Sequence, residues 1–305
     1  MNYEVIIIGG GPAGMSAALV LGRSRIKSLV LNAENPRNSI TTHSHGFLTQ
    51  DGIHPSEIFK TAKEQLSKYT DVTYKNEKAI EVTKTDDYFE VRSEENSYSS
   101  NRVIIATGYR DNIKEVGIKG LEDVYGKSVY PCPFCDGFEM ADKQLAVFGD
   151  AMMGPMFSKV IAHWSNDVIV FTNGEKVTDQ ELLKSLQTNN IRLIDKKIKQ
   201  LKSIDGILSG IELEDDTIIK RQGGFIADTM AVENTNFARN LNVPIENGHF
   251  GMESYKVDEN KETEIKGLYI IGDARSGWTG VAGAVNEGSV VGKAITHQII
   301  EEHWK

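Results

Sequence analysis

The chain has only two cysteines in 305 residues, and both belong to one short motif, Cys132-Pro133-Phe134-Cys135. So few cysteines exclude the disulfide framework of a small secreted protein. Basic residues are also in deficit, since 34 lysines and arginines face 43 aspartates and glutamates and give a formal net charge of −9. Nucleic-acid binding needs a clustered basic face, so this balance argues against a nucleic-acid partner.

Long apolar runs are lacking as well, and none approaches the roughly 20 residues of a membrane-spanning helix. Met1-Asn2-Tyr3-Glu4 does not have the basic segment that opens a signal peptide. We therefore expect a cytoplasmic protein with no membrane association. The length suits two domains of ordinary size, and the content of 40% hydrophobic and 25% charged residues is that of a globular protein.

The first third of the chain shows the pattern of a nucleotide-binding unit. Val5-Ile6-Ile7-Ile8 is a β-branched run typical of a buried parallel strand, and a glycine loop and a small-residue helix over about 15–23 follow it. A strand over 28–31 completes a βαβ unit. Residues 72–98 alternate between polar and apolar, which predicts an antiparallel meander at a sheet edge, and 103–108 form a further buried strand that ends in a glycine turn.

A second unit of the same kind begins after residue 113. A strand over 144–149 again leads into glycine, a helix follows to about 164, and a strand over 168–171 comes next. From about residue 234 the first pattern returns, with a strand over 268–273 and a helix over 281–303. We predict an α/β fold of two Rossmann-like, three-layer ββα nucleotide-binding domains, one inserted in the other. The outer domain would comprise 1–113 and 236–305, and the inserted domain 114–235.

The first glycine loop has the spacing of a dinucleotide-binding fingerprint. Gly9 permits the tight turn, Gly11 lets the backbone approach a pyrophosphate, and Gly14 lets helix and strand pack closely. Pro12 and Ala13 complete the loop. Because the loop leads from a strand into a helix, whose free N–H groups attract phosphates, we favour a cofactor site over a turn that merely needs glycines.

The rest of the cofactor site is predicted at two other places. The acidic partner of the ribose should lie about 20 residues on, where Asn32 stands nearest; Glu34 follows and is the better acceptor, so both are candidates. Gly272-Asp273 lies between a strand and a helix, so Asp273 offers a carboxylate to a ribityl chain and the helix directs its N-terminus at a flavin. These features favour FAD over NAD.

The cysteine pair has three interpretations. A zinc site needs four ligands, and neither a further cysteine nor a suitable histidine spacing exists, so we predict no metal. A structural disulfide closing so short a loop adds little stability, which favours a redox-active pair. A helix starting at or just after the pair would lower the thiol pKa. Asp136 is either the N-cap of that helix, an acid-base group for the thiols, or both.

Four motifs in this order resemble the low-molecular-weight thioredoxin reductases, which are FAD-dependent pyridine nucleotide-disulfide oxidoreductases. The motifs are Gly9-x-Gly11-x-x-Gly14, Ala106-Thr107-Gly108, Cys132-x-x-Cys135-Asp136-Gly137 and Gly272-Asp273. The resemblance implies a discontinuous FAD domain that includes Ala106-Thr107-Gly108 in its cofactor site, an inserted pyridine-nucleotide-type domain with the redox pair, and a homodimer. It also implies that Cys135 faces the flavin, that Cys132 attacks the substrate disulfide, and that Asp136 is the acid-base residue.

The inserted domain departs from the family pattern where a nicotinamide nucleotide would bind. The family has a Gly-x-Gly-x-x-Ala loop, whereas this chain reads Gly149-Asp150-Ala151-Met152-Met153-Gly154. Ala151 replaces the glycine that admits the pyrophosphate, and Asp150 adds negative charge. In place of the family's His-Arg-Arg cluster stands Thr172-Asn173-Gly174-Glu175, which has no cation. Whether NADPH or NADH binds is therefore left open.

Other details resemble the divergent branch that contains the fungal gliotoxin oxidases and related dithiol oxidases. They are the residues Pro133 and Phe134 between the two cysteines, the stretch His43-Ser44-His45-Gly46 and the segment Trp164-Ser165. That branch reoxidises its flavin with oxygen, and another divergent branch takes electrons from ferredoxin. Three functions follow: dithiol oxidation or use of a non-nicotinamide electron partner, an NAD(P)H-dependent thioredoxin-disulfide reductase, and a flavin-binding redox sensor without turnover. The substrate would be a thioredoxin-like protein or a small dithiol or disulfide.

Some residues have two interpretations. His43 and His45 lie in a loop that could border the flavin, where a base would help to deprotonate a dithiol, but both also fit an ordinary loop. Trp278 would either cover the flavin or fill a dimer contact. We expect the remaining histidines at the surface or in packing; they are His54, His163, His249, His297 and His303.

Overall fold

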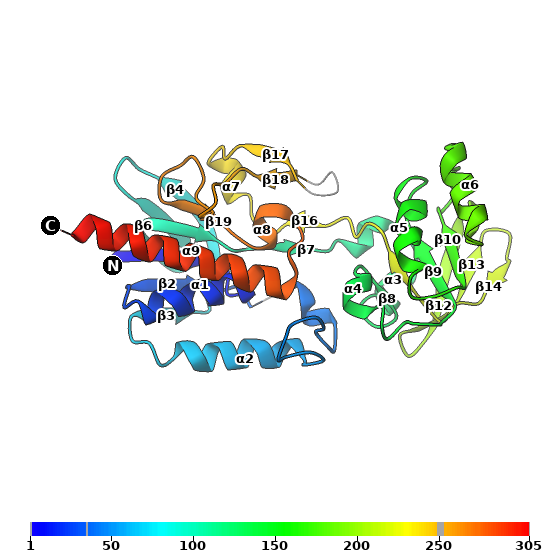
Figure 1. Cartoon of the computed structure of the whole chain (residues 1–305), viewed down its shortest axis with the longest axis horizontal. Coiled ribbons are helices and arrows are strands. Elements are labelled where there is room, and N and C mark those ends of the chain that lie inside the picture. The colour runs from blue at the N-terminus through cyan, green and yellow to red at the C-terminus, as the bar shows by residue number, and fades with distance from the viewer. Residues whose placement is uncertain (1, 35, 249–252, 305) are drawn as a thin grey trace. The chain divides into compact units, whose positions relative to one another are not determined.

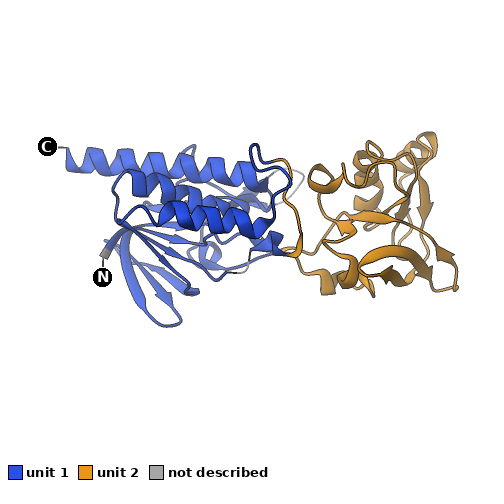
Figure 2. Ribbon diagram, turned by 90° about the horizontal axis from the view of Figure 1, so that it is seen from below, with its two compact units in different colours: residues 1–39, 47–110, 232–305 blue, residues 40–46, 111–231 orange. Residues whose placement is uncertain are grey.

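The computed structural model describes residues 2–34, 36–248 and 253–304, so His249 lies outside the described residues. The chain divides into two compact units, coloured blue and orange in Figure 2. Unit 1 comprises Met1–Ser39, Phe47–Arg110 and Val232–Lys305. Unit 2 comprises Ile40–Gly46 and Asp111–Ala231. The sequence did not indicate that the short segment 40–46 belongs with unit 2.

Unit 1 is built on a seven-stranded sheet in which four strands run parallel in the order β3, β2, β1, β6. Figure 1 labels β2, β3, β4, β6 and β19 of this sheet. β6 is long, so its first half pairs with antiparallel β5 while its second half pairs with parallel β19. The strands are β1 (Asn2–Ile8), β2 (Ser28–Leu31), β3 (Val72–Lys75), β4 (Ala79–Lys84), β5 (Phe89–Ser93), β6 (Ser97–Ile105) and β19 (Leu268–Ile270). The meander predicted over 72–98 is wrong at its start, because β3 pairs in parallel with β2.

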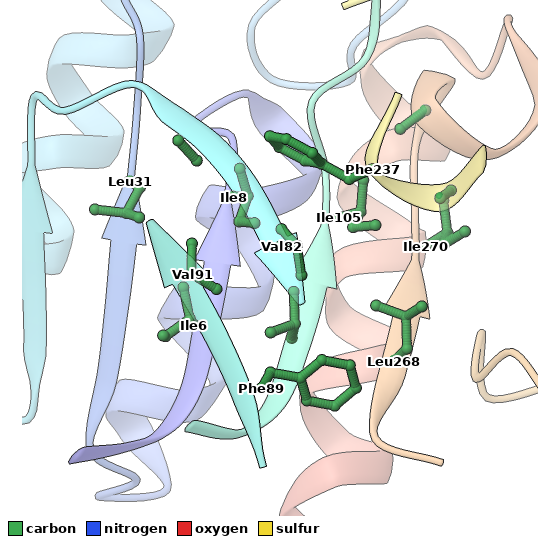
Figure 3. Close-up of a cluster of buried hydrophobic side chains, with 14 of the residues drawn as sticks. Ile6, Ile8, Leu31, Val82, Phe89, Val91, Ile105, Phe237, Leu268 and Ile270 are labelled. Carbon is green, nitrogen blue, oxygen red and sulfur yellow. The ribbon is translucent and has the colours of Figure 1, made fainter. Parts of the chain in front are cut away.

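The two faces of this sheet bury different layers. On one face Ile6 and Ile8 pack with Val82 and Phe89 of the antiparallel strands, as Figure 3 shows. On the other face the alternate residues Val5 and Ile7 pack beneath helices. Those helices are α1 (Pro12–Arg23) and α9 (Gly280–His303), and α2 (Pro55–Leu66) packs against α1. The period-two alternation of β1 thus divides its side chains between two hydrophobic cores.

Shorter elements complete unit 1. They are a 3₁₀ turn at its boundary with unit 2 (Arg37–Ile40), β7 (Tyr109–Arg110), β16 (Val232–Glu233), α7 (Phe237–Asn240), β17 (Ile245–Asn247), β18 (Glu253–Tyr255) and α8 (Asp273–Ser276). In the part of the chain that the structure describes, no helix is both long and apolar enough to span a membrane.

Unit 2 repeats the three-layer arrangement on a five-stranded parallel sheet in the order β11, β10, β9, β15, β8. Its strands are β8 (Val129–Tyr130), β9 (Leu145–Phe148), β10 (Val168–Phe171), β11 (Arg192–Ile194) and β15 (Gly223–Ile226). One face packs against helices α5 (Met153–Ile161) and α6 (Gln180–Thr188). The other face packs against the antiparallel strands β12 (Ile198–Ile204), β13 (Ile207–Leu213) and β14 (Ile218–Ile219).

Two short helices and a 3₁₀ turn lie in the connections of unit 2: Ile113–Val116, α3 (Leu121–Val124) and α4 (Pro133–Asp136). In both units a parallel sheet thus has helices on one face and antiparallel strands on the other. The predicted α/β class with two Rossmann-like, three-layer domains is confirmed.

Candidate active site

Three of the sequence motifs meet at one edge of the sheet in unit 1. β1, β6 and β19 are neighbouring parallel strands, and Ile8, Ile105 and Ile270 stand in register near their carboxyl ends. The glycine loop follows β1, Ala106-Thr107-Gly108 follows β6, and Gly272-Asp273 follows β19. This edge is where open α/β sheets bind nucleotides.

The glycine loop between β1 and α1 forms a cradle for an anion. Gly9 has φ 111°, and a side chain there would collide with the carbonyl oxygen of Ala106, as one at Gly14 would with the carbonyl oxygen of Gly9. At Gly11, by contrast, a Cβ would meet no atom within 4 Å. α1 begins after Gly11 with no side-chain cap and no acidic residue in its first turn. Its N-terminal N–H groups therefore suit a dinucleotide pyrophosphate.

The two ribose candidates have different surroundings. The Asn32 side chain lies against the glycine loop, because its Oδ1 accepts a hydrogen bond from Gly10 N at 3.0 Å and its Nδ2 donates to Tyr74 Oη at 2.7 Å. The Glu34 carboxylate is paired with Lys63 of α2 at 2.6 Å. Asn32 is therefore the better placed of the two, and its contact with a ribose stays a prediction.

Asp273 is held in a fixed orientation at the start of α8. Its Oδ1 accepts hydrogen bonds from both N and Oγ1 of Thr279 at 2.8 Å, and its Oδ2 lies 3.3 Å from Nη1 of Arg37. The Arg37 guanidinium lies 5.0 Å from the ring centroid of Trp278. α9 begins just after Thr279 without a side-chain cap hydrogen bond or an acidic first turn. Sequence reasoning missed Arg37 and Thr279, since neither lies in a recognisable motif.

The turn after β6 is anchored by a segment distant in sequence. Asn234 donates from Nδ2 to the Thr107 carbonyl oxygen at 2.8 Å and from its backbone N to the Gly108 carbonyl oxygen at 3.1 Å. Thr107 Oγ1 lies 3.1 Å from Thr235 Oγ1. Gly108 has φ 65°, a value that favours glycine. These contacts fix Ala106-Thr107-Gly108 at the sheet edge, and the sequence had not indicated Asn234 or Thr235.

A buried carboxylate supports the Gly272 turn. Glu287 of α9 is only 6% exposed, and its Oε2 accepts a hydrogen bond from Gly272 N at 2.7 Å. Its Oε1 pairs with Arg275 at 3.0 Å and with Lys261 at 3.4 Å. Buried carboxylates are rare unless they are paired in this way. The signal for Glu287 was in the sequence, because it interrupts the small and apolar face of the last helix.

The cysteine pair lies in unit 2, where Cys132 and Cys135 form a disulfide with a Cα–Cα distance of 5.3 Å. Cys132 is 5% exposed and is the N-cap residue of α4. Its carbonyl oxygen accepts hydrogen bonds from the backbone N–H groups of Cys135 and Asp136 at 3.2 and 3.1 Å. Asp136 is the last residue of α4, so the interpretation of Asp136 as an N-cap is wrong. The acid-base interpretation of Asp136 stays a prediction.

The surroundings of Asp136 favour its protonated form. Burial raises the pKa of Asp136 to about 7, and repulsion from Glu139 adds to this effect while attraction to His45 opposes it. Burial, and then the negative charges of Asp136 and Glu139, raise the pKa of nearby Tyr130 to about 12. Nε2 of His45 lies 3.5 Å from Oε1 of Glu139. A carboxyl group that titrates near neutral pH beside a disulfide is suited to exchange protons with thiols.

Exposed aromatic side chains flank the cysteine pair. Phe134, between the two cysteines, is 78% exposed and lies edge-on to Trp164, with 5.6 Å between the ring centroids. Phe138 is 84% exposed. A Cβ on Gly137 would approach the Trp164 ring to 2.7 Å, so this glycine allows the turn after α4 to lie against the indole.

The second glycine loop, between β9 and α5, is occupied by side chains of the protein. Oδ1 of Asp150 accepts hydrogen bonds from the backbone N–H groups of Met152 and Met153 at 2.8 and 2.5 Å. Oε2 of Glu175 accepts one from Ala151 N at 3.1 Å. The turn after β10 directs Glu175 here, because Thr172 Oγ1 donates to the Glu175 carbonyl oxygen at 2.5 Å. Among the described residues, no group of three or more His, Cys, Asp or Glu side chains is placed to hold a metal.

The fold and the site are those of a nucleotide-binding oxidoreductase that contains a Cys-x-x-Cys disulfide. Residues 3–288 match the family described as Pyridine nucleotide-disulphide oxidoreductase, and the chain belongs to this family. It is similar to a solved protein from Bacillus anthracis assigned as thioredoxin reductase TrxB, with 30% identity and a TM-score of 0.91 over 99% of this chain and 100% of that one.

Two further relatives cover nearly the whole chain. Thioredoxin reductase aclD from Aspergillus oryzae is 28% identical over 97% of this chain and 96% of its own length. Thioredoxin reductase from Bacillus subtilis is 25% identical over 98% and 95%. The resemblance to the thioredoxin reductases is thereby confirmed, and the protein is an FAD-dependent disulfide oxidoreductase.

Proposed function

We propose that this enzyme exchanges two electrons with a dithiol or disulfide substrate through Cys132 and Cys135 and does not use a nicotinamide nucleotide as its reductant. The observation that supports the second part is the occupied loop of unit 2. Three backbone N–H groups at the start of α5, where a pyrophosphate would bind, already donate to Asp150 and Glu175. The loop satisfies its own N–H groups with carboxylates of the same chain.

A nucleotide phosphate would have to displace both carboxylates and remain beside them. Two like charges about 4 Å apart repel by about 1 kcal/mol in bulk water and by about 4 kcal/mol near a protein surface. The phosphate would also have to regain hydrogen bonds that the loop makes without it. Both effects weaken the binding of NADPH and NADH. We therefore propose that the flavin exchanges electrons with another partner, either oxygen or ferredoxin.

The thiol chemistry of the pair balances as two exchange steps. A thiolate of the substrate attacks the sulfur of Cys132, forms a mixed disulfide and releases the thiolate of Cys135. The second thiol of the substrate then attacks the first substrate sulfur, which is bonded to Cys132 in the mixed disulfide. This step forms the substrate disulfide and releases the thiolate of Cys132. The two substrate protons pass to the enzyme, and Asp136 is the acid-base group beside the pair. Bound FAD supplies the two-electron acceptor for the reduced cysteines.

With oxygen as the final acceptor, the overall reaction converts a dithiol and O₂ into a disulfide and H₂O₂. The exposed aromatic rings of Phe134 and Phe138 beside the cysteines suit a substrate with an apolar body. In the opposite direction the same exchange steps reduce a disulfide. The names of the Bacillus subtilis and Aspergillus oryzae relatives favour that second candidate, an NAD(P)H-dependent thioredoxin-disulfide reductase.

One experiment separates these candidates. The oxidised enzyme is mixed anaerobically with NADPH, with NADH or with a small dithiol, and the visible absorbance of the flavin is followed. We expect the dithiol to bleach the flavin rapidly and both nucleotides to leave it oxidised. Rapid bleaching by micromolar NADPH would overturn the proposal in favour of the reductase. A flavin that none of the three reduces would favour a redox sensor without turnover.

A homodimer and a cytoplasmic location belong to the same proposal. The family resemblance supports the dimer, and a chain whose only two cysteines belong to one Cys-x-x-Cys motif suits a reducing compartment. Sedimentation equilibrium of the FAD-loaded protein tests the dimer, and fractionation of the source cells tests the location.

A further inference from the structure

Segment 40–46 brings a histidine to the redox pair from a distant part of the sequence. The segment is part of unit 2, and its residue Ser44 is buried. Ile40 lies close to Gly126, because a Cβ added to Gly126 would come within 3.0 Å of the Ile40 side chain. His45 is thereby placed 3.5 Å from Glu139, with side-chain exposures of 21% and 43%. The neighbouring His43 is exposed and stacks on the ring of His45, with 6.2 Å between centroids.

Glu139 and Asp136 lie on the same side of the chain after the cysteines. The backbone continues to wind beyond α4, since Met140 N donates to the Asp136 carbonyl oxygen at 3.2 Å. Residues three apart on such a turn are neighbours. Two carboxylates therefore stand side by side next to the disulfide, and the imidazole of His45 faces one of them. The other titratable group near Asp136 is Tyr130, whose hydroxyl donates to the Lys127 carbonyl oxygen at 2.5 Å.

We propose that His45 is a positioning residue for the thiol-disulfide steps: its imidazole, paired with Glu139, balances the negative charge beside Asp136 and keeps that carboxyl group able to exchange a proton with the cysteines. The inference rests on the proposed function, in which Asp136 is the acid-base group. Protonated His45 and ionised Glu139 act on Asp136 with opposite signs. Burial is the main reason that the pKa of Asp136 is raised to about 7, and His45 and Glu139 adjust it in opposite directions.

Because His45 and Glu139 change the pKa of Asp136 in opposite directions, replacing each of them should shift the pKa of Asp136 in opposite directions. The FAD-loaded enzyme is reduced, freed of dithiothreitol anaerobically, and alkylated with iodoacetamide from about pH 5 to about pH 9, where groups near neutrality titrate. The inflection that belongs to Asp136 is the one that Asp136→Asn removes. We expect His45→Asn to move that inflection to higher pH and Glu139→Gln to move it to lower pH, each by about half a unit to one unit. The double variant should lie near wild type.

His43→Asn is the matched control, because it changes the same segment and leaves the pair of His45 and Glu139 in place. We expect its inflection to coincide with that of wild type. The proposal fails if His45→Asn and Glu139→Gln move the inflection in the same direction or not at all, as a merely structural role would predict. Alkylation needs no substrate, so opposite shifts without dithiol turnover would uphold the role of His45 and contradict the proposed function alone.

Discussion

The carboxylate of Glu175 accepts a hydrogen bond from the backbone N–H of Ala151, 3.1 Å away, and so closes the second glycine loop with a side chain from the next strand-end turn. An N–H group of this kind receives a phosphate oxygen when a loop binds a dinucleotide. The same atoms cannot serve both purposes at once. Replacing Glu175 should therefore free this N–H group and favour nucleotide binding.

We predict that Glu175→Arg combined with Asp150→Gly and Ala151→Gly gives the enzyme a measurable NADPH site. The change removes two carboxylates, makes room at position 151 and adds a guanidinium that can bind a phosphate through two hydrogen bonds. NADPH-driven flavin reduction should become at least about tenfold faster at low nucleotide concentration, as stopped-flow absorbance will measure. Glu94→Arg, on an exposed turn of unit 1, changes the charge at one surface carboxylate without touching the loop and should have no effect. Equal rates in wild type and triple variant would contradict the proposal.

Asp136→Asn should slow the proton-coupled exchange by about tenfold to a thousandfold, which is the range of general acid-base catalysis. The pH profile of dithiol oxidation should also lose its inflection near the pKa of Asp136, about 7. In wild type the base form of Asp136 prevails above that pH, so oxidation should rise with pH through it. A profile that is unchanged in Asp136→Asn would remove Asp136 from the reaction.

The same raised pKa makes the stability of the oxidised protein depend on pH. Burial is the main cause of the shift from 3.8 to about 7, so the folded state binds this proton more tightly than the unfolded state. The contribution of Asp136 to stability is complete below about pH 4 and is lost as pH rises through about 7. Asp136→Asn should therefore raise the free energy of unfolding at pH 8 by about 1–3 kcal/mol and leave it nearly unchanged at pH 4. Urea titrations at the two pH values measure this, and an equal effect at both would contradict the linkage.

Asp273→Ala should weaken the retention of FAD by about tenfold, because Thr279 and Arg37 hold this carboxylate in one orientation at the nucleotide-binding edge of the sheet. The measurement is the fraction of flavin retained after dilution, with chromatography to show that the released flavin is FAD and not FMN. Asp86→Ala, in an exposed turn of the antiparallel strands, is the control and should retain FAD like wild type. Unchanged retention in Asp273→Ala would exclude Asp273 from the cofactor site.

The two cysteines should differ in their spectra. If Cys135 is the sulfur next to the flavin, Cys132→Ser leaves a thiolate beside the oxidised ring and should show a long-wavelength charge-transfer band. Cys135→Ser should lack the band and trap a substrate as a mixed disulfide on Cys132. Both variants should lose turnover, because exchange needs an attacking and a resolving thiol. A band in Cys135→Ser alone would reverse the two roles.

The elements with strong local patterns could be predicted from the sequence. β2 and β10 have the predicted bounds, since each is buried along its length and is apolar throughout apart from Ser28. β3 was assigned to the meander because its mixture of polar and apolar residues reads the same whether the neighbouring strand is parallel or antiparallel. Pairing depends on the path of the chain, and a local pattern does not contain that path.

The site was predictable where a motif specifies a backbone conformation and less so where distant side chains meet. The glycine loop required certain residues at fixed spacing, so Gly9, Gly11 and Gly14 were recognisable. The pairs of Asn32 with Gly10, Arg37 with Asp273 and His45 with Glu139 join residues that are 22, 236 and 94 positions apart. The sequence showed that Thr172-Asn173-Gly174-Glu175 contains no lysine or arginine. It did not show that the Glu175 carboxylate accepts a hydrogen bond from the backbone of the second glycine loop.

Because segment 40–46 packs with unit 2 while its flanking residues belong to unit 1, the chain passes between the units at four points, after Ser39, Gly46, Arg110 and Ala231. Unit 2, which contains the cysteine pair, is therefore built from two separate segments of the sequence. A chimaera that exchanged only residues 111–231 with a relative would place that relative's residue at position 139 opposite the native His45. Engineering of substrate range by domain exchange will have to transfer both pieces together.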